Sequence, residues 1–110
     1  MKIENAKAQM RKGVLEYCIL LVLKGEPRYA INIIQGLKEA KLIVVEGTLY
    51  PLLTRLKNDG LLKYRWEEST QGPPRKYYEL TEEGTTFLGE LENSWGNLVD
   101  AVGKVKTNRA

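Results

Sequence analysis

The sequence predicts a mainly α-helical fold with a two-stranded β-hairpin. Residues 8–23 form an almost continuously apolar stretch, and in two further stretches up to residue 58 apolar residues recur every three or four positions, which is the period of helices that bury one face. Over residues 62–67 the apolar period changes to two, and a Gly-Pro-Pro turn cluster separates that stretch from another at 75–80. We therefore expect three helices, a hairpin and a final helix, in that order.

The first two predicted helices are separated by a glycine and a proline. From Ala8 to Leu23 the chain is almost continuously apolar after Lys12, which indicates a helix buried on several sides. Gly25 supplies its C-terminal stop, and Pro27 fits the first turn of the next helix, where its missing N–H would have no partner. The second helix has one apolar face, formed by Tyr29, Ala30, Ile33, Ile34, Leu37 and Ala40.

The third predicted helix contains a proline near its start. Asn58, Asp59 and Gly60 end this helix, and its buried stripe is Leu49, Leu52, Leu53 and Leu56. Pro51 lies in the first turn if Thr48 is the cap, or crowds the carbonyl of Gly47 if the helix begins near Glu46. In both cases Pro51 lies toward the N-terminal end and presents a rigid apolar surface.

The hairpin is expected to have a basic tip. In the first strand, Leu62, Tyr64 and Trp66 form an apolar face that alternates with Lys63, Arg65 and Glu67. Residues 69–74 form a turn cluster that we do not expect inside a strand, and residues 75–80 return as the second strand.

The last predicted helix covers roughly residues 82–106. Thr81 is its expected cap, and Glu82 and Glu83 suit the positive first turn. Three helices, a hairpin and a final helix are the order of a winged helix-turn-helix with an appended helix. We expect residues 1–80 to form that domain and residues 81–110 to form a C-terminal dimerisation helix and tail.

Composition narrows the classes of protein further. The chain has 110 residues and no histidine, and no loop of the phosphate-cradling type is present, so we expect no enzyme, no cofactor and no metal site. Cys18, the single cysteine, lies in an apolar run and is expected to pack as a small hydrophobe. The sequence shows neither a signal-peptide pattern nor an apolar run of about 20 residues. We therefore expect the protein to lie in the cytoplasm and not to associate with a membrane.

Charge and exposed polar residues point to double-stranded DNA as a partner. Residues 1–76 carry 14 Lys and Arg against 8 Asp and Glu, a net charge of +6, whereas residues 77–110 carry 3 against 6, a net charge of −3. The exposed positions of the third helix are Glu46, Thr48, Tyr50, Pro51, Thr54, Arg55 and Lys57. Among them, the threonines and Tyr50 supply hydroxyls, and Arg55 and Lys57 supply positive charge. Arg75 and Lys76 at the hairpin tip suit a phosphate backbone. The alternative is a winged-helix protein-interaction module that does not bind DNA.

The last helix carries an apolar stripe, which we call the seam, and this stripe must be buried against another surface. Its residues step by three and four along the helix: Leu88, Leu91, Trp95, Leu98, Val102 and Val105. The seam can pack back on its own domain, but pairing with a second copy in a homodimer is the favoured interpretation. Trp95 either anchors that interface or lines a cavity for a small aromatic or apolar effector. Gly89, Gly96 and Gly103 recur every seven residues, and we hypothesise that they let another backbone approach.

Three runs of residues, at 47–56, 58–62 and 72–84, resemble the PadR-like transcriptional regulators. The resemblance extends over roughly residues 10–100 and implies a homodimeric repressor of the short subgroup, with a single C-terminal dimerisation helix. It also implies an inverted-repeat operator that is released when a small molecule binds. The residues that match the family motifs by position are Tyr29, Thr48, Tyr50, Pro51, Arg55, Arg75 and Lys76. The chain departs from them at Ala30, where glycine is frequent, and at Val45, where a polar cap is common.

Overall fold

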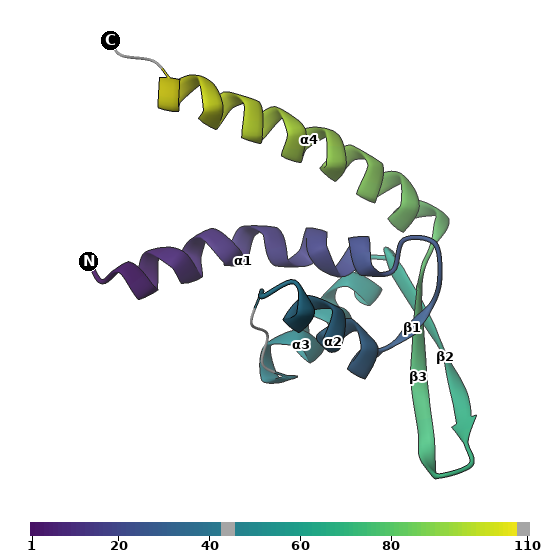
Figure 1. Cartoon of the computed structure of the whole chain (residues 1–110). Helices are drawn as coiled ribbons and strands as arrows, with labels where there is room; N and C mark the ends of the chain where they lie inside the picture. Colours follow the sequence, from purple (N-terminus) through teal and green to yellow (C-terminus); the bar gives the residue numbers. More distant parts are fainter. Residues whose placement is uncertain (43–45, 108–110) are drawn as a thin grey trace.

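Within residues 1–42 and 46–107, which the computed structural model describes, the chain forms four α-helices and a three-stranded antiparallel sheet (Figure 1). In chain order the elements are α1 (Ile3–Val22), β1 (Arg28–Tyr29), α2 (Ala30–Glu39), α3 (Glu46–Asn58), β2 (Leu62–Ser69), β3 (Gly72–Leu80) and α4 (Glu82–Thr107). The mainly helical class and the order of helices and hairpin are therefore confirmed. Val45 lies outside the described residues.

The sheet has one strand more than the predicted hairpin. Arg28 and Tyr29 pair with Tyr78 and Tyr77 on the free edge of β3, which gives the strand order β1-β3-β2. The prediction that Pro27 opens the second helix is wrong, because this pairing holds Tyr29 extended, at φ −73° and ψ 156°, and α2 begins only at Ala30. The first helix also begins earlier than predicted, at Ile3.

The hairpin strands reach further into the turn cluster than predicted. Pro73 and Pro74 lie at the start of β3, so the turn is shorter than the predicted cluster and covers residues 70–71. Near the hairpin tip β3 pairs only with β2, so its other edge is unpaired there. On an unpaired edge, the missing N–H of a proline removes no hydrogen bond from the sheet. A register shift between Glu67 and Ser69 further loosens the pairing at the tip.

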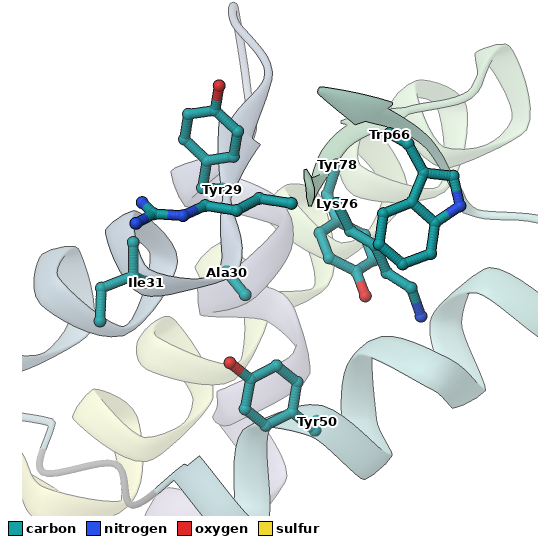
Figure 2. Close-up of a pocket in the computed structure, with 8 residues that line it drawn as sticks. Tyr29, Ala30, Ile31, Tyr50, Trp66, Lys76 and Tyr78 are labelled. Atoms are coloured by element: carbon teal, nitrogen blue, oxygen red, sulfur yellow. The ribbon is translucent and has the colours of Figure 1, made fainter. Parts of the chain in front are cut away.

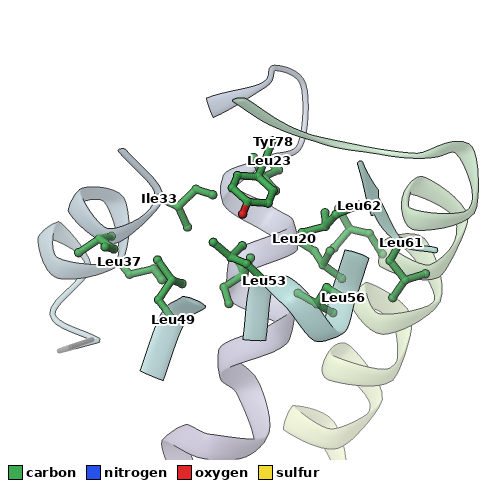
Figure 3. Packing of buried hydrophobic residues seen from close by; sticks show 13 residues of the cluster. Leu20, Leu23, Ile33, Leu37, Leu49, Leu53, Leu56, Leu61, Leu62 and Tyr78 are labelled. Atoms are coloured by element: carbon green, nitrogen blue, oxygen red, sulfur yellow. The ribbon is translucent and has the colours of Figure 1, made fainter. Parts of the chain in front are cut away.

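One buried apolar cluster holds the helices and the sheet together (Figure 3). It contains Ile19, Leu20, Leu23, Ile33, Ile34, Leu37, Leu49, Leu53, Leu56, Leu61, Leu62, Tyr78 and Leu88. The predicted stripe of the third helix is thus buried except for Leu52, which is half-buried. Cys18 is also half-buried, and burial raises the pKa of its thiol, which agrees with a packing role.

The α3 helix begins at Glu46, so Pro51 lies inside the helix. Of the two alternatives for Pro51, the structure has the one in which its ring faces the carbonyl of Gly47, one turn earlier. A glycine there leaves the backbone free to adjust, and the space around Gly47 is open. At the other end of this helix, Gly60 takes the expected left-handed conformation, with φ +81°.

Thr81 fastens the start of α4 to the loop before β2. Its Oγ1 accepts the N–H of Gly84 at 2.9 Å, as the predicted cap should, and donates to the carbonyl of Gly60 at 2.6 Å. The N–H of Thr81 donates to the carbonyl of Leu61 at 3.1 Å. These bonds bring the first turn of α4 against the backbone of Leu61, so position 84 has no room for a side chain.

Beyond Leu88, α4 leaves the core and extends alongside α1, and the two helices diverge toward the chain termini (Figure 1). A salt bridge of 3.0 Å between Lys24 and Glu92 joins the end of α1 to α4. Among the described helices, none combines the length and apolar character that crossing a lipid bilayer requires.

Candidate nucleic-acid interface

The outer surface of α3 is the first part of the candidate interface. All the α3 residues predicted to contact DNA whose side chains are described are exposed: Thr48, Tyr50, Pro51, Thr54, Arg55 and Lys57. They divide between two flanks of the helix. Tyr50, Thr54 and Lys57 lie on the flank toward the sheet, where they border the same hollows as Lys76.

Arg55 lies on the other flank of α3, against α1. Its guanidinium forms an ion pair with the carboxylate of Glu16, in which the two side chains are 56% and 38% exposed. An exposed pair of this kind contributes at most about 1 kcal/mol, so a phosphate or a base edge can replace Glu16. Sequence reasoning did not find this partner, because the two residues are brought together only by the packing of α1 against α3.

The wing, the β2–β3 hairpin, holds its lysine in place with aromatic rings. The ammonium of Lys76 lies 4.6 Å from the ring centroid of Tyr64 and 5.5 Å from that of Trp66. Lys57 of α3 approaches the same Tyr64 ring, at 5.8 Å. Because cations are attracted to the faces of aromatic rings, Tyr64 brings a wing lysine and a helix lysine to one side of the molecule.

Trp66 is more exposed than the predicted strand pattern implies. It shares the face of Tyr64 but is 61% exposed, because it pairs with Lys76 beyond the end of the core. On the opposite face of the sheet, Arg65 lies 4.9 Å from the ring of Tyr77 and bonds to Glu67 at 2.6 Å. The basic residues of the hairpin are therefore divided, with Lys76 on the face of Tyr64 and Arg65 on the opposite face.

A hollow of about 430 Å³ lies between the start of α2, the side of α3 and the wing (Figure 2). We call it the wing hollow. Its lining residues are Tyr29, Ala30, Ile31, Tyr50, Trp66, Arg75, Lys76 and Tyr78. Four predicted site residues thus meet at one place, namely Tyr29, Tyr50, Arg75 and Lys76. Tyr29 borders the hollow while its ring packs against Tyr77, at 4.7 Å between centroids.

Tyr78 forms the floor of the wing hollow and was not among the predicted site residues. It is only 5% exposed. Burial raises the pKa of its hydroxyl, and the neighbouring Tyr64 and Tyr50 raise it further, so the group stays protonated at neutral pH and can donate a hydrogen bond. The available sequence signal was the alternation of the strand, which puts Tyr78 on the same face as Lys76.

The seam on α4 is buried at its start and exposed further along. Leu88 lies in the core and Leu91 is half-buried, whereas Trp95, Leu98 and Val102 are 42%, 54% and 49% exposed. The exposed part borders a groove of about 740 Å³ between α1 and α4. We call it the α1–α4 groove, and it is lined by Met10, Arg11, Gly13, Val14, Trp95, Leu98, Val99, Val102, Gly103 and Lys106.

Trp95 packs on one side against α1, where its ring lies 6.2 Å from that of Tyr17. The repeated glycines Gly89, Gly96 and Gly103 have open space where a Cβ would be. Nothing in residues 1–42 and 46–107 therefore requires glycine at these three positions.

The fold and the interface define a winged-helix protein of the class that regulates transcription. The model of the transcriptional regulator PadR-like family matches residues 19–90. The chain belongs to this family of transcriptional regulators, which agrees with the expectation that it is not an enzyme.

Solved structures agree with this assignment. A PadR-like transcription factor from Bacteroides fragilis is 70% identical, with a TM-score of 0.78 over 92% of this chain and 98% of that one. A PadR family transcriptional regulator from Eggerthella lenta is 36% identical, with a TM-score of 0.87 over 96% and 94%. The structure of Bacillus subtilis PadR in complex with operator DNA is 26% identical, with a TM-score of 0.65 over 71% of this chain and 46% of that one.

Proposed function

We propose that the protein binds double-stranded DNA, with α3 in the major groove and the wing along the adjacent backbone. The observation that carries this proposal is the convergence of Lys57 and Lys76 on the Tyr64 ring, beside the exposed hydroxyls of α3. Cations there can neutralise phosphates while the helix reaches base edges. The similarity to Bacillus subtilis PadR, solved with operator DNA, supports the same use of the fold.

We further propose that the protein is a homodimer that represses transcription from an inverted-repeat operator. The support is the exposed apolar seam on α4 and the α1–α4 groove beside it, since a second copy can cover both. Two-fold related α3 helices then read two half-sites, which is the usual match between a symmetric dimer and a palindromic operator. The glycines on α4 are proposed to let the partner backbone approach.

Replacing Lys76 with alanine should weaken binding to every duplex, and the slope of log K against log salt should become shallower by about 0.9, the value for one lost phosphate contact. Replacing Arg55 should instead reduce the preference for the operator over other sequences if Arg55 reads a base. Both are measured by fluorescence anisotropy on operator and scrambled duplexes. Lys63→Ala is the matched control, because Lys63 is an exposed lysine of β2 that alternates with Tyr64 and Trp66.

Equal affinities for all three variants and the wild-type protein would contradict this assignment of the surface. Absence of binding to any duplex at low salt would favour the alternative, a winged-helix protein-interaction module without DNA affinity.

A small aromatic or apolar effector is proposed to bind in the α1–α4 groove against Trp95 and to release the operator. In a Trp66→Phe background, the fluorescence of Trp95 should be quenched on titration with flat aromatic compounds, because Trp95 is then the only indole. The same compounds should lower the affinity for DNA. Unchanged fluorescence across a panel of such compounds, with DNA binding intact, would leave Trp95 as a packing residue.

A further inference from the structure

The wing hollow contains a convergent set of hydrogen-bond donors. The residues that line it include two tyrosines, Tyr50 and Tyr78, and two cationic residues, Arg75 and Lys76. Figure 2 shows Tyr50, Lys76 and Tyr78 around the hollow. Its eight lining residues include no carboxylate. A site with donors and positive charge and without a competing acid is suited to an oxyanion.

The start of α2 adds backbone donors to this set. Ala30 and Ile31, the first two residues of this ten-residue helix, line the hollow. The first N–H groups of a helix have no partner within the helix, and Tyr29 at the cap position makes no side-chain hydrogen bond to them. No acidic residue occupies the first turn, so the positive end of the helix is not neutralised by its own side chains.

The hydroxyl of Tyr78 is the most specific feature of the hollow. The ring is 5% exposed and lies in the core, yet in the described part of the chain the hydroxyl has no hydrogen-bond partner. No solvent-inaccessible polar side-chain atom without a partner occurs among the described residues, so this oxygen has access to the surface, where Tyr78 lines the wing hollow and a smaller hollow beside it. In Figure 2 the Tyr78 hydroxyl is directed from the strand toward α3, and the Tyr50 hydroxyl is directed from α3 toward the start of α2. A buried ring whose hydroxyl has no partner among the described residues leaves that donor available to a group from outside the protein.

We propose that the wing hollow binds a single phosphate group of the DNA backbone, with the Tyr78 hydroxyl as the donor at its floor. This inference rests on the proposed DNA binding and adds a buried, uncharged contact to the exposed cations. The hollow lies between α3 and the wing, which are the two elements expected to contact neighbouring parts of one duplex. Trp66 and Tyr50 provide apolar walls for the attached sugar.

The test uses Tyr78→Phe in the full-length protein, because this change removes only the hydroxyl. Affinity for duplexes of any sequence should fall about tenfold, the usual effect of losing one hydrogen bond to a charged group. The melting temperature without DNA should stay the same or rise, because the hydroxyl has no hydrogen-bond partner among the described residues of the free protein. Tyr77→Phe is the matched control, since Tyr77 faces the other side of β3 and should change neither quantity.

Three outcomes would overturn the proposal. Tyr78→Phe could bind DNA as the wild-type protein does while Lys76→Ala is weakened, in which case DNA binding stands and the phosphate contact does not. Tyr78→Phe could lower the melting temperature by several degrees, which would make the hydroxyl structural. The wild-type protein could bind no duplex at all, in which case the proposed function fails as well.

Titration with inorganic phosphate separates a DNA phosphate from a free one. In the DNA-backbone proposal, the amide resonances of Ala30 and Ile31 shift with a duplex, and they shift less with the same duplex in Tyr78→Phe. Shifts with inorganic phosphate but not with a duplex would make the hollow a site for a free phosphate group and overturn the backbone assignment. No shift with either would overturn the site itself.

Discussion

Replacing Gly84 with alanine should destabilise the protein by about 3 kcal/mol or more. A Cβ at this position would overlap the carbonyl oxygen of Leu61 and lie 3.0 Å from its carbonyl carbon. Both are backbone atoms, so neither can move aside as the end of a side chain could. Relief requires α4 to shift, and that shift breaks the bonds by which Thr81 joins α4 to Gly60 and Leu61.

Chemical denaturation measures this effect, and Gly89→Ala is its control. Gly89 lies on the same helix with open space around its Cβ position within the described chain. In a Leu98→Asp background, which removes the proposed dimer contact of the α4 glycines, alanine there should stabilise the protein by about 1 kcal/mol. Equal free energies of unfolding for Gly84→Ala and the wild-type protein would show that α4 does not depend on this close contact.

Placing an aspartate in the exposed seam should convert the proposed dimer into a monomer and remove most of its DNA affinity. Leu98 and Val102 are 54% and 49% exposed, so Leu98→Asp and Val102→Asp introduce a charge where a second copy is proposed to pack. Each winged-helix domain should still fold, because neither residue belongs to the buried cluster. Loss of the paired half-site contact should weaken operator binding by on the order of a hundredfold or more.

Sedimentation velocity and anisotropy on a full operator measure the two effects. Asn97→Asp is the matched control, because Asn97 is exposed on the same helix and helical spacing puts it opposite Leu88 and Trp95. A wild-type protein that sediments as a monomer, or a Leu98→Asp variant that remains dimeric, would contradict the proposed use of the seam.

Much of the fold could be predicted because its helices follow from local periodicity. Neighbouring residues are enough to predict the leucine stripe of α3, the glycine that ends this helix and the Thr81 cap of α4. The β1 strand could not be predicted, since two residues show no period and Arg28 becomes strand only by pairing with Tyr78. Pro73 and Pro74 misled the prediction for the same reason, because whether an edge is open depends on where a distant strand ends.

The candidate site was predictable as a set of exposed residues but not as an arrangement. Spacing alone could assign Tyr50 and Lys76 to the surface, but not their meeting across the wing hollow. The Arg55–Glu16 pair and the unpaired Tyr78 hydroxyl depend on how α1 and β3 pack against α3. Strand alternation puts Tyr78 on the face of Lys76 but does not reveal its part in the site, because its ring is buried.

The salt dependence of duplex binding by the full-length protein tests the central claim most directly. The claim is that α3 and the wing together bind the DNA backbone and the major groove. Affinity measured by anisotropy should fall linearly on a log–log plot as salt rises, with a slope near −0.9 for each phosphate that is neutralised, and Lys76→Ala should make that slope shallower. Absence of binding to any duplex at about 50 mM salt, where phosphate contacts are strongest, would contradict the claim.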